Sequence, residues 1–383
     1  MVEEKESTLN QEDVVVTEEG LTRGEAAEMS QTQLMVLRFR RNKLSMLGLI
    51  MLAIIYTLVA FGNFLGPNDP MSQNQNYLYG PPSQLSLRGP NGEFGLYTYE
   101  VSTELDIDTF KFVFAPGEKI PVRFFVRGDS YKLLGLFQTD LHLFGADAPN
   151  RIYLFGADAL GRDMFTRVLI GGQISMTVGL LGVLLTIVLG SLFGAASGYW
   201  GGIVDDVMQR IIEVISCFPQ IPLWAALAAA LPKTSASFTM LHRYFLITVI
   251  LSLVSWMGLA RQLRGKVMAY SRADFTSAAL IAGASDFRII LKHMLPNAAS
   301  HIVVVAALAV PGMIMGETAL SFLGLGLSRP MFSWGVLISE AQQIAVIIQH
   351  PWLMIPAVAV ILAVFAFSVL GDGLRDAVDP YSI

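Results

Sequence analysis

Residues 168–204 read VLIGGQISMTVGLLGVLLTIVLGSLFGAASGYWGGIV and contain no Asp, Glu, Lys or Arg. About 20 apolar residues are enough for a helix to cross the ~30 Å hydrocarbon core of a bilayer. A run of this length without a charge is therefore long enough to span a membrane. It places the chain among membrane proteins rather than among water-soluble domains.

The composition of the whole chain agrees with this class. Of its 383 residues, 53% are hydrophobic and 15% are charged, whereas soluble domains carry about 25% charged residues. The net charge of −5 gives no support to nucleic-acid binding. The single cysteine, Cys217, excludes an internal disulfide, a cysteine metal cluster and a CxxC redox pair.

Other parts of the chain contain further stretches of the same character. They lack all four charged residue types, and one of them, Met294–Gly316, contains the titratable His301. We therefore predict an all-α polytopic membrane protein with six transmembrane helices, which puts both termini on one side of the membrane. The further stretches are Leu44–Asn68, Val214–Pro232, Tyr244–Ala260, Met294–Gly316 and Pro351–Gly371.

The distribution of basic residues predicts which side that is. Four basic residues lie at positions 38–43, just before the first span, and six more lie between Arg261 and His293. Short segments rich in Lys and Arg stay in the cytoplasm, so we expect both termini and the 261–297 loop to be cytoplasmic. The first 31 residues hold nine acids and two bases, which predicts a disordered or weakly helical tail.

These assignments divide the chain into five parts. Residues 69–167 are the only stretch with the composition of a soluble domain, and we predict a small β-rich extracytoplasmic insert there; a disordered loop is the alternative. The parts are an N-terminal tail (1–43), a first transmembrane helix (44–68), the insert (69–167), a transmembrane core (168–371) with its cytoplasmic loop (261–297), and a C-terminal tail (372–383).

Within the insert, three runs have the alternation and aromatic content of strands. They are Leu96–Val101, Thr109–Phe114 and Ile120–Val126. The sequence Ala115-Pro116-Gly117-Glu118-Lys119 between the last two runs predicts a turn.

The cytoplasmic loop reads as two short helices joined at Gly283, because glycine accepts the positive φ that often ends a helix. Small side chains at Ala278 and Ala279 would let another protein approach the backbone closely, while Phe275 and Leu280 could fill pockets in it. An amphipathic helix lying on the membrane is the alternative. The predicted helix caps are Asp274 for the first helix and Ser285 or Asp286 for the second, and Pro296 is predicted to open the next span.

The same loop has a recognisable spacing. Ala278-Ala279, three residues, Gly283, eleven residues and Leu295-Pro296 resemble the EAA loop in permease subunits of bacterial ATP-binding-cassette (ABC) importers. Ser277 stands where that pattern has a glutamate, and His293 where it has an isoleucine. Other segments resemble the C-type permease of the dipeptide, oligopeptide and nickel branch: Gly156–Arg167, Gly198–Gly202, Glu317–Gly326 and Gly371–Asp376.

This resemblance implies a type I importer permease in the bacterial inner membrane. Such a subunit forms a path for peptides with a homologous permease, and receives substrate from an extracytoplasmic binding protein; oligosaccharides or nickel chelates are alternative substrates. Two ATP-binding subunits would hold ATP and Mg, with no cofactor on this chain and no enzymatic activity of its own. The residues expected to dock on an ATPase subunit are Asp274, Ser277, Ala278, Ala279, Gly283, Leu295 and Pro296.

The sequence itself argues against other classes. It contains no G-x-x-x-x-G-K-[ST] phosphate-binding loop, so an ATPase is not on this chain. A self-contained secondary transporter or channel is disfavoured because few ionisable residues lie inside the spans. A membrane-embedded hydrolase would need a catalytic cluster or a GxSxG-like elbow, and neither is present.

A few residues inside or next to the spans attract attention. Glu213 and Glu317 are the acids nearest the hydrocarbon and should face protein or water. The resemblance puts Glu317 near an outer mouth with Ser321, Phe322 and Trp334, either as part of a path or gate or, as we favour, in a structural hydrogen-bonding role. His301 is expected to be a packing residue, because no second His or Cys lies at metal spacing.

Glycines and prolines predict how the helices pack. Gly190, Gly194 and Gly198 recur every fourth residue, a spacing that favours close helix packing, within the subunit rather than between copies. Pro219, Pro222 and Pro311-Gly312 interrupt helices and predict kinks, which could be static or could act as hinges.

Overall fold

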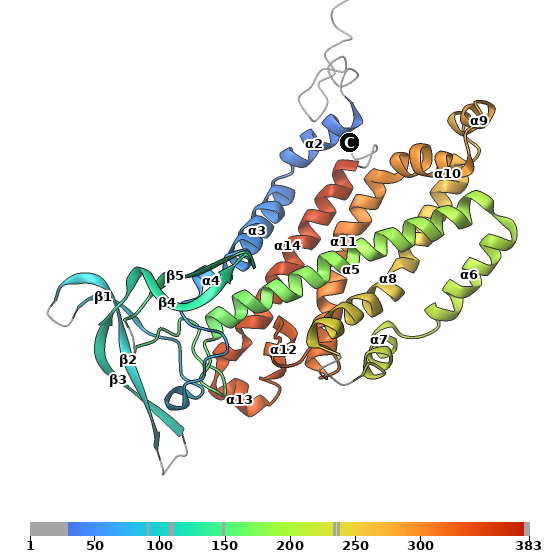
Figure 1. Ribbon diagram of the computed structural model, residues 1–383. Helices are drawn as coiled ribbons and strands as arrows, with labels where there is room; N and C mark the ends of the chain where they lie inside the picture. Colours follow the sequence, from blue (N-terminus) through green and yellow to red (C-terminus); the bar gives the residue numbers. More distant parts are fainter. Residues whose placement is uncertain are drawn as a thin grey trace, which may run out of the picture.

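The computed structural model describes residues 30–89, 92–106, 111–147, 150–232, 235 and 238–378. Five of its helical segments are long and apolar enough to cross a membrane, which confirms the all-α membrane class (Figure 1). They are α3 (Lys43–Ala60), α5 (Met164–Trp200), α8 (Met240–Tyr270), the segment Asp286–Phe322 and the segment Pro351–Val378.

Two of these segments are composite. The first joins α10 (Asp286–Ile289), a π-helical turn (Ile290–Met294) and α11 (Leu295–Phe322). The second joins a 3₁₀ turn (Pro351–Met354) to α14 (Ile355–Val378).

The predicted third span is not one helix. Helices α6 (Gly202–Ser216) and α7 (Gln220–Ala229) are bent by 86° at a short break, so the count reaches six only if the pair is one span. Pro219 lies at the break as the N-cap residue of α7, and Pro222 falls in the first turn, where no intrahelical N–H is needed. Pro311, by contrast, lies inside α11.

Helix α5 runs through the middle of the molecule and packs along α8 (Figure 1). A Cβ at Gly194 would lie 2.6 Å from the carbonyl oxygen of Ala260, and one at Gly198 would lie 2.6 Å from that of Arg264. At Gly190 it would lie 2.9 Å from the side chain of Leu259. The glycine spacing therefore brings two helices of one subunit together, as predicted.

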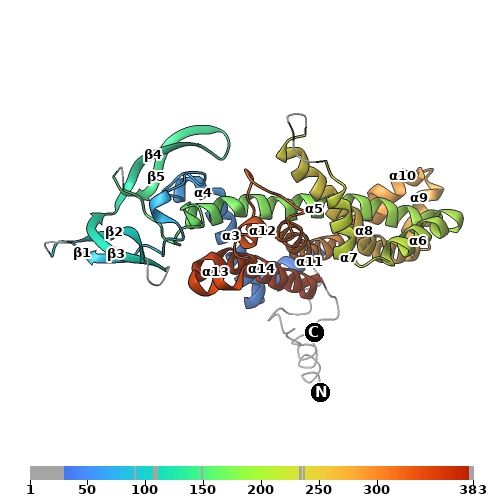
Figure 2. The ribbon, with the colours of Figure 1, turned by 90° about the horizontal axis from the view of Figure 1, so that it is seen from below.

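The insert contains the predicted β-structure. Strands β1 (Leu85–Arg88), β2 (Phe94–Asp106) and β3 (Lys111–Pro121) form an antiparallel sheet, and β4 (Arg123–Leu133) pairs with β5 (Phe137–Gly145) in a separate hairpin. Figure 2 shows the hairpin and the sheet on different sides of the insert.

The turn predicted at 115–119 is wrong. These residues lie inside β3, and the register against β2 shifts between Tyr99 and Val101, opposite Lys119 and Pro116. Strand β3 is at the edge of its sheet, where the N–H that Pro116 lacks is not needed and a bulge can absorb an extra residue. Thr109 and Phe110 of the predicted strand lie outside the described residues.

The helices extend past the uncharged runs. Helix α2 (Gln31–Arg41) precedes the first span, with Ser30 as its N-cap. Helix α5 begins at Met164, four residues before the run, because Asp163 accepts the N–H groups of Phe165 and Thr166. Of the N-terminal tail predicted for residues 1–43, residues 1–29 lie outside the described residues, and α2 occupies most of the rest.

The remaining helices are short. Helix α4 (Gly62–Leu65) follows the first span, and α9 (Asp274–Ile281) lies in the 261–297 loop. Helices α12 (Trp334–Ser339) and α13 (Ile344–Gln349) lie at the other end of the molecule (Figure 1).

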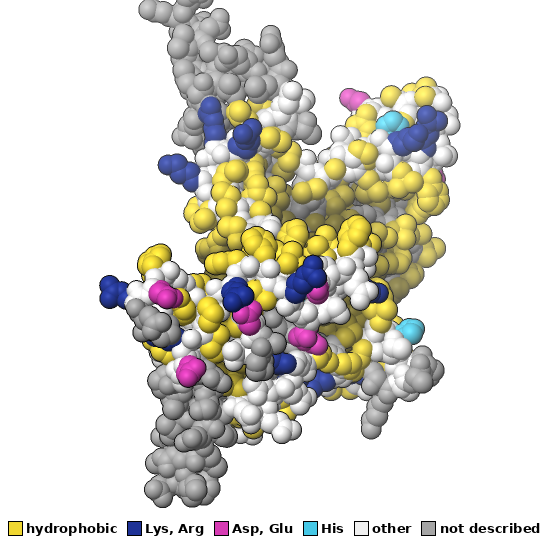
Figure 3. All heavy atoms as spheres, turned by 60° about the vertical axis from the view of Figure 1, so that its left-hand side comes forward, with side chains coloured by type: hydrophobic (Ala, Val, Ile, Leu, Met, Phe, Trp, Pro, Cys, Tyr) yellow, Lys and Arg dark blue, Asp and Glu magenta, His cyan; other side chains and the backbone are white. Residues whose placement is uncertain are grey.

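Hydrophobic and charged side chains occupy different levels of the molecular surface. Figure 3 shows a continuous hydrophobic band across the helices, with Lys and Arg side chains gathered above and below it. Such a band is the surface expected of a protein that is surrounded by lipid.

The α5–α8 contact can be tested with a single methyl group. We expect Gly194→Ala to lower the melting temperature in detergent, because the added Cβ meets backbone atoms of Ala260, and overpacking costs about 1–3 kcal/mol. Gly258→Ala on α8 is the matched control, since nothing lies within 4 Å of its added Cβ. Equal melting temperatures for the two variants would show that the helices do not approach closely.

Candidate functional site

The loop between α8 and α11 folds as two short helices. Helix α9 ends at Ile281, Gly283 has a φ of +75°, and α10 starts at Asp286, so the prediction of two helices joined at Gly283 is confirmed. Asp274 is the first residue of α9 and not its cap, which is Ala273 with no side-chain hydrogen bond. Ser285 occupies the cap position of α10, also without a side-chain cap hydrogen bond.

Most of the predicted docking residues are on the surface of this loop. Asp274, Ser277, Ala278, Gly283 and Pro296 are exposed.

Two other members of the set face inward. Ala279 and Leu295 are half-buried against a small apolar cluster. The cluster consists of Ala195, Val267, Ile289, Ile290 and Met294. A bulky residue at 279 would therefore disturb the loop itself as well as any partner, whereas one at 278 would not meet this cluster.

Large apolar side chains are exposed on the same loop. Leu280, Ile281, Phe287 and Leu291 are 51%, 89%, 63% and 58% exposed. We call these four residues the apolar loop surface. Several exposed large apolar side chains on one short loop are typical of a site of contact with another molecule.

Polar contacts fix the loop to the ends of the spans. The hydroxyl of Tyr199 donates to Asp286 at 2.9 Å, and the indole of Trp200 donates to the same carboxylate at 3.3 Å. The hydroxyl of Thr276 donates to the carbonyl of Tyr270 at 2.7 Å. Asp286, proposed as a helix cap, thus holds α10 against the end of α5.

The loop continues directly into a span. The π-helical turn Ile290–Met294 follows α10, and α11 starts at Leu295 with Pro296 in its first turn. Because the helix is continuous, a displacement of α10 would be passed to α11.

A second group of predicted residues meets at the other end of α11. Glu317 is fully buried and accepts hydrogen bonds from Ser175, Ser321 and Ser333 at 3.0, 2.7 and 2.5 Å. The backbone N–H of Trp334 donates to the hydroxyl of Ser175 at 3.1 Å. This network joins α5, α11 and the start of α12.

The structure separates Phe322 from this network. Phe322 is 36% exposed, whereas the indole N–H of Trp334 is buried and donates to the carbonyl of Val168 at 2.8 Å. Of the four residues suggested for a path or gate, three therefore lie in one buried cluster and one lies at the surface.

A buried group of charges, which we call the ion cluster, was missed from the sequence. Arg162 and Arg167 both pair with Asp158, and they lie 3.1 and 3.0 Å from Glu340. Arg329 also reaches Glu340, at 2.9 Å. Three of its charges lie within the 156–167 segment, so the only sequence feature that could have predicted the cluster was the close spacing of these charges just before a span.

Charge pairing dominates the titration of Glu340. Burial raises its pKa, but the hydrogen bonds and positive charges of Arg167, Arg162 and Arg329 outweigh burial and lower the pKa to about 2. The carboxylate is therefore ionised at any physiological pH, and its pairing stabilises the fold above the ordinary pKa of 4.5.

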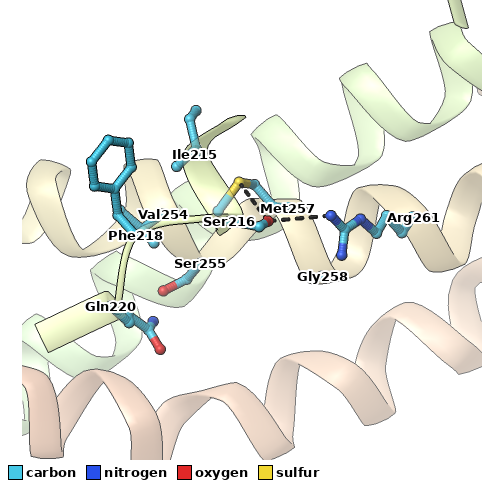
Figure 4. Close-up of a pocket in the computed structure, with 9 residues that line it drawn as sticks. All are labelled: Ile215, Ser216, Phe218, Gln220, Val254, Ser255, Met257, Gly258 and Arg261. Atoms are coloured by element: carbon cyan, nitrogen blue, oxygen red, sulfur yellow. Dashed lines mark hydrogen bonds between the residues drawn. The ribbon is translucent and has the colours of Figure 1, made fainter. Parts of the chain in front are cut away.

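Two adjoining hollows run along α7, α8 and α11. One, of about 330 Å³, contains Ser216, Gln220, Ser255 and Arg261, and Figure 4 shows Arg261 directed toward Ser216, with a hydrogen bond of 3.2 Å. The other, of about 420 Å³, shares Gln220 and Ser255. The hollows are lined by polar and apolar groups together, and none of the Glu317 network residues lines them.

Glu213 and His301, which the sequence also brought to notice, each have a polar partner. Glu213 pairs with Arg210 at 3.0 Å on the surface, and His301 lies 2.9 Å from the amide oxygen of Gln262. Cys217 is exposed. Within the described part of the chain, His, Cys, Asp and Glu side chains form no group that could hold a metal ion.

Comparison with known proteins identifies the kind of molecule. Residues 187–381 match the family model of the binding-protein-dependent transport system inner membrane component. The chain belongs to this family. Residues 30–82 of the permease also match the N-terminal transmembrane domain of oligopeptide transport permease C.

The names of individual relatives agree with this family. The permease is 42% identical to the oligopeptide transport system permease protein OppC of Haemophilus influenzae, over 62% of this chain and 70% of that one. It is 31% identical to the dipeptide transport system permease protein DppC of Bacillus subtilis, over 92% of this chain and 86% of that one. A glutathione transport system permease protein, GsiD of Pectobacterium atrosepticum, is 36% identical over 61% and 74%.

The ion cluster gives a stability test of the permease. We expect Glu340→Ala to destabilise the fold by about 3–5 kcal/mol at pH 7, because the buried Arg162 and Arg167 would then share the single carboxylate of Asp158. Melting temperature in detergent measures this loss. Glu213→Ala, which breaks an exposed pair, should change stability by less than about 0.5 kcal/mol.

The loss should also depend on pH. As the pH falls below about 4.5, Glu340 takes up a proton in the unfolded chain, whereas in the folded protein it does so only near about 2, so the difference between wild type and Glu340→Ala should shrink over this range. Similar losses in the two alanine variants at pH 7 would contradict the importance of the buried cluster.

Proposed function

We propose that this permease is a membrane subunit of an ATP-driven importer of peptides. The observation that carries the proposal is the apolar loop surface, which is exposed on a loop fixed to α5 and continuous with α11. The names of the relatives support peptides as the substrate class, since they are transporters of oligopeptides, dipeptides and glutathione.

In this proposal the loop docks on an ATPase subunit. Ala278 gives close access to the backbone of α9, and the apolar loop surface fills pockets of the partner. Movement of the partner would shift α10, and the contacts of Asp286 with Tyr199 and Trp200 would pass that shift to α5. The same movement would reach α11 through the continuous helix.

The full assembly would have several parts. We expect a homologous permease, two ATP-binding subunits that hold ATP and Mg, and an extracytoplasmic binding protein that delivers the peptide. This chain would then neither bind nor hydrolyse ATP, in keeping with its lack of a phosphate-binding loop.

We also propose that the two hollows form this subunit's share of the translocation path. Gln220 and Ser255 are common to both hollows and offer hydrogen-bonding groups between apolar walls, which suits a peptide backbone. The Glu317 network would instead hold α5, α11 and α12 in place, because its carboxylate is buried and bonded to three hydroxyl groups.

The docking role predicts a defined effect of Ala278→Trp. A bulky side chain in a packed contact costs about 1–3 kcal/mol, so recovery of ATPase subunits should fall roughly 5- to 150-fold. Peptide uptake should fall with it while membrane insertion stays normal. Copurification and uptake of a radiolabelled peptide measure these effects.

Ala230→Trp, at an exposed alanine after α7, is the matched control and should leave ATPase recovery unchanged. If α9 merely lies on lipid, Ala278→Trp should be neutral, because tryptophan favours the membrane interface. Normal ATPase recovery and uptake in Ala278→Trp would therefore reject the docking role.

The proposed orientation has its own test. In a Cys217→Ala background, Ser130→Cys in the insert should react with a membrane-impermeant thiol reagent in intact cells, whereas Ser285→Cys in the loop should react only after lysis. Both positions are exposed, so accessibility on each side is comparable. Labelling of Ser285→Cys in intact cells would reverse the topology.

A further inference from the structure

The tip of the β4–β5 hairpin is apolar and exposed. Its sequence is Leu133-Leu134-Gly135-Leu136-Phe137, and the side chains of Leu134, Leu136 and Phe137 are 55%, 76% and 67% exposed. Among the strands that the structure describes, β4 and β5 pair only with each other. A two-stranded ribbon is marginally stable by itself, so this hairpin needs a contact beyond its own strands.

The backbone conformation at the tip disfavours the leucine at position 134. The N–H of Leu136 donates to the carbonyl of Leu133 at 3.0 Å, and the two residues between them, Leu134 and Gly135, have φ values of +51° and +74°. Positive φ at both positions is typical of a type I′ turn, which favours Asn-Gly and penalises a side chain such as leucine. Turn formation therefore does not explain the apolar side chain of Leu134.

The hairpin is attached at the end of the first span. His142 Nδ1 lies 2.6 Å from the carbonyl oxygen of Gly66, directly after α4, and the N–H of Asp69 donates to the carboxylate of Asp129 at 3.2 Å. Leu134 is five residues beyond Asp129, which limits its reach to about 17 Å. The tip therefore lies within about 17 Å of its attachment at the end of the first span.

The span next to this attachment is little buried within the chain. Only 22% of α3 is buried within the chain, the smallest share among the five candidate spans. In Figure 1, β4 and β5 lie at the level of α4 and the first part of α5, whereas β2 and β3 extend away from the helices. Figure 3 shows that the hydrophobic band of the helices begins at this side of the insert.

We infer that the tip Leu133–Phe137 inserts into the lipid interface of the leaflet next to α4 and anchors the insert on the membrane. Lipid fits the tip because its five residues carry no charged or hydrogen-bonding side chain. Tyr131 and Lys132 follow immediately behind it on β4, and these are residue types that place an apolar stem in lipid and a polar group at the headgroups.

Spin labels at two positions test this placement in the full chain. In a Cys217→Ala background, Leu136→Cys is labelled and the protein is reconstituted in nanodiscs of phosphatidylethanolamine and phosphatidylglycerol. The label should collide more with oxygen, which concentrates in lipid, than with a water-soluble nickel complex. Phe94→Cys on β2, 89% exposed, is the control and should show the reverse preference.

Two outcomes would overturn the inference. A label at 136 that meets the nickel complex as often as one at 94 would place the tip in water. A label that neither reagent reaches would show that another protein covers the tip.

A second variant separates insertion from folding. Leu134→Asn suits the turn and Phe137→Thr suits the strand, so the double variant should keep the melting temperature of the parent. Its label at 136 should shift toward the collision pattern of position 94, because the apolar side chains that hold the tip in lipid are gone. An unchanged pattern in this folded variant would also overturn the inference.

Discussion

A Cβ at Gly194 would lie 2.6 Å from the backbone of α8, so α5 and α8 meet backbone to backbone. Moving an apolar side chain from lipid into a helix interface gains little free energy. Close van der Waals packing therefore has to hold the helices together. Small residues on other faces of α5 serve the same end. Gly179 faces Val310 and Ile314 of α11, and Gly172 faces the indole of Trp334. The other helices are arranged around this one.

Polar contacts hold both ends of α5. At its start, Arg167 belongs to the ion cluster with Asp158 and Glu340, and at its end Tyr199 and Trp200 hold Asp286 of the loop. One helix therefore connects the two ends of the molecule. A rigid element with fixed ends is what the proposed coupling between loop and path requires.

The buried carboxyl group of Glu317 is matched by hydrogen-bond partners. Glu317 would be costly in an apolar core, yet three hydroxyl groups donate to it, so the carboxylate binds three structural elements together. The exposed apolar groups of the loop and of the hairpin are the opposite case. They lack cover within the described chain, and their positions at opposite ends of the helices suit different partners, a protein for the loop and lipid for the hairpin.

Local pattern was enough to find most of the elements. Uncharged runs located the spans because lipid excludes charge over a fixed thickness, and the glycine repeat at 190–198 predicted close packing because only glycine permits it. Gly283 ended α9 as expected, because a positive φ favours glycine. These features depend on a residue and its near neighbours.

The failures have the opposite origin. The residues at 115–119 look like a turn, and only pairing with β2 at a sheet edge makes them part of a strand. Of the two cap candidates for α10, Ser285 occupies the cap position, whereas the carboxylate of Asp286 accepts hydrogen bonds from Tyr199 and Trp200, more than 80 residues away. The sequence by itself determined that the chain spans a membrane and where most of its spans lie. Only the tertiary structure decided that Glu340 pairs with Arg167, because a pairing across 173 residues depends on which surfaces meet after the helices have packed.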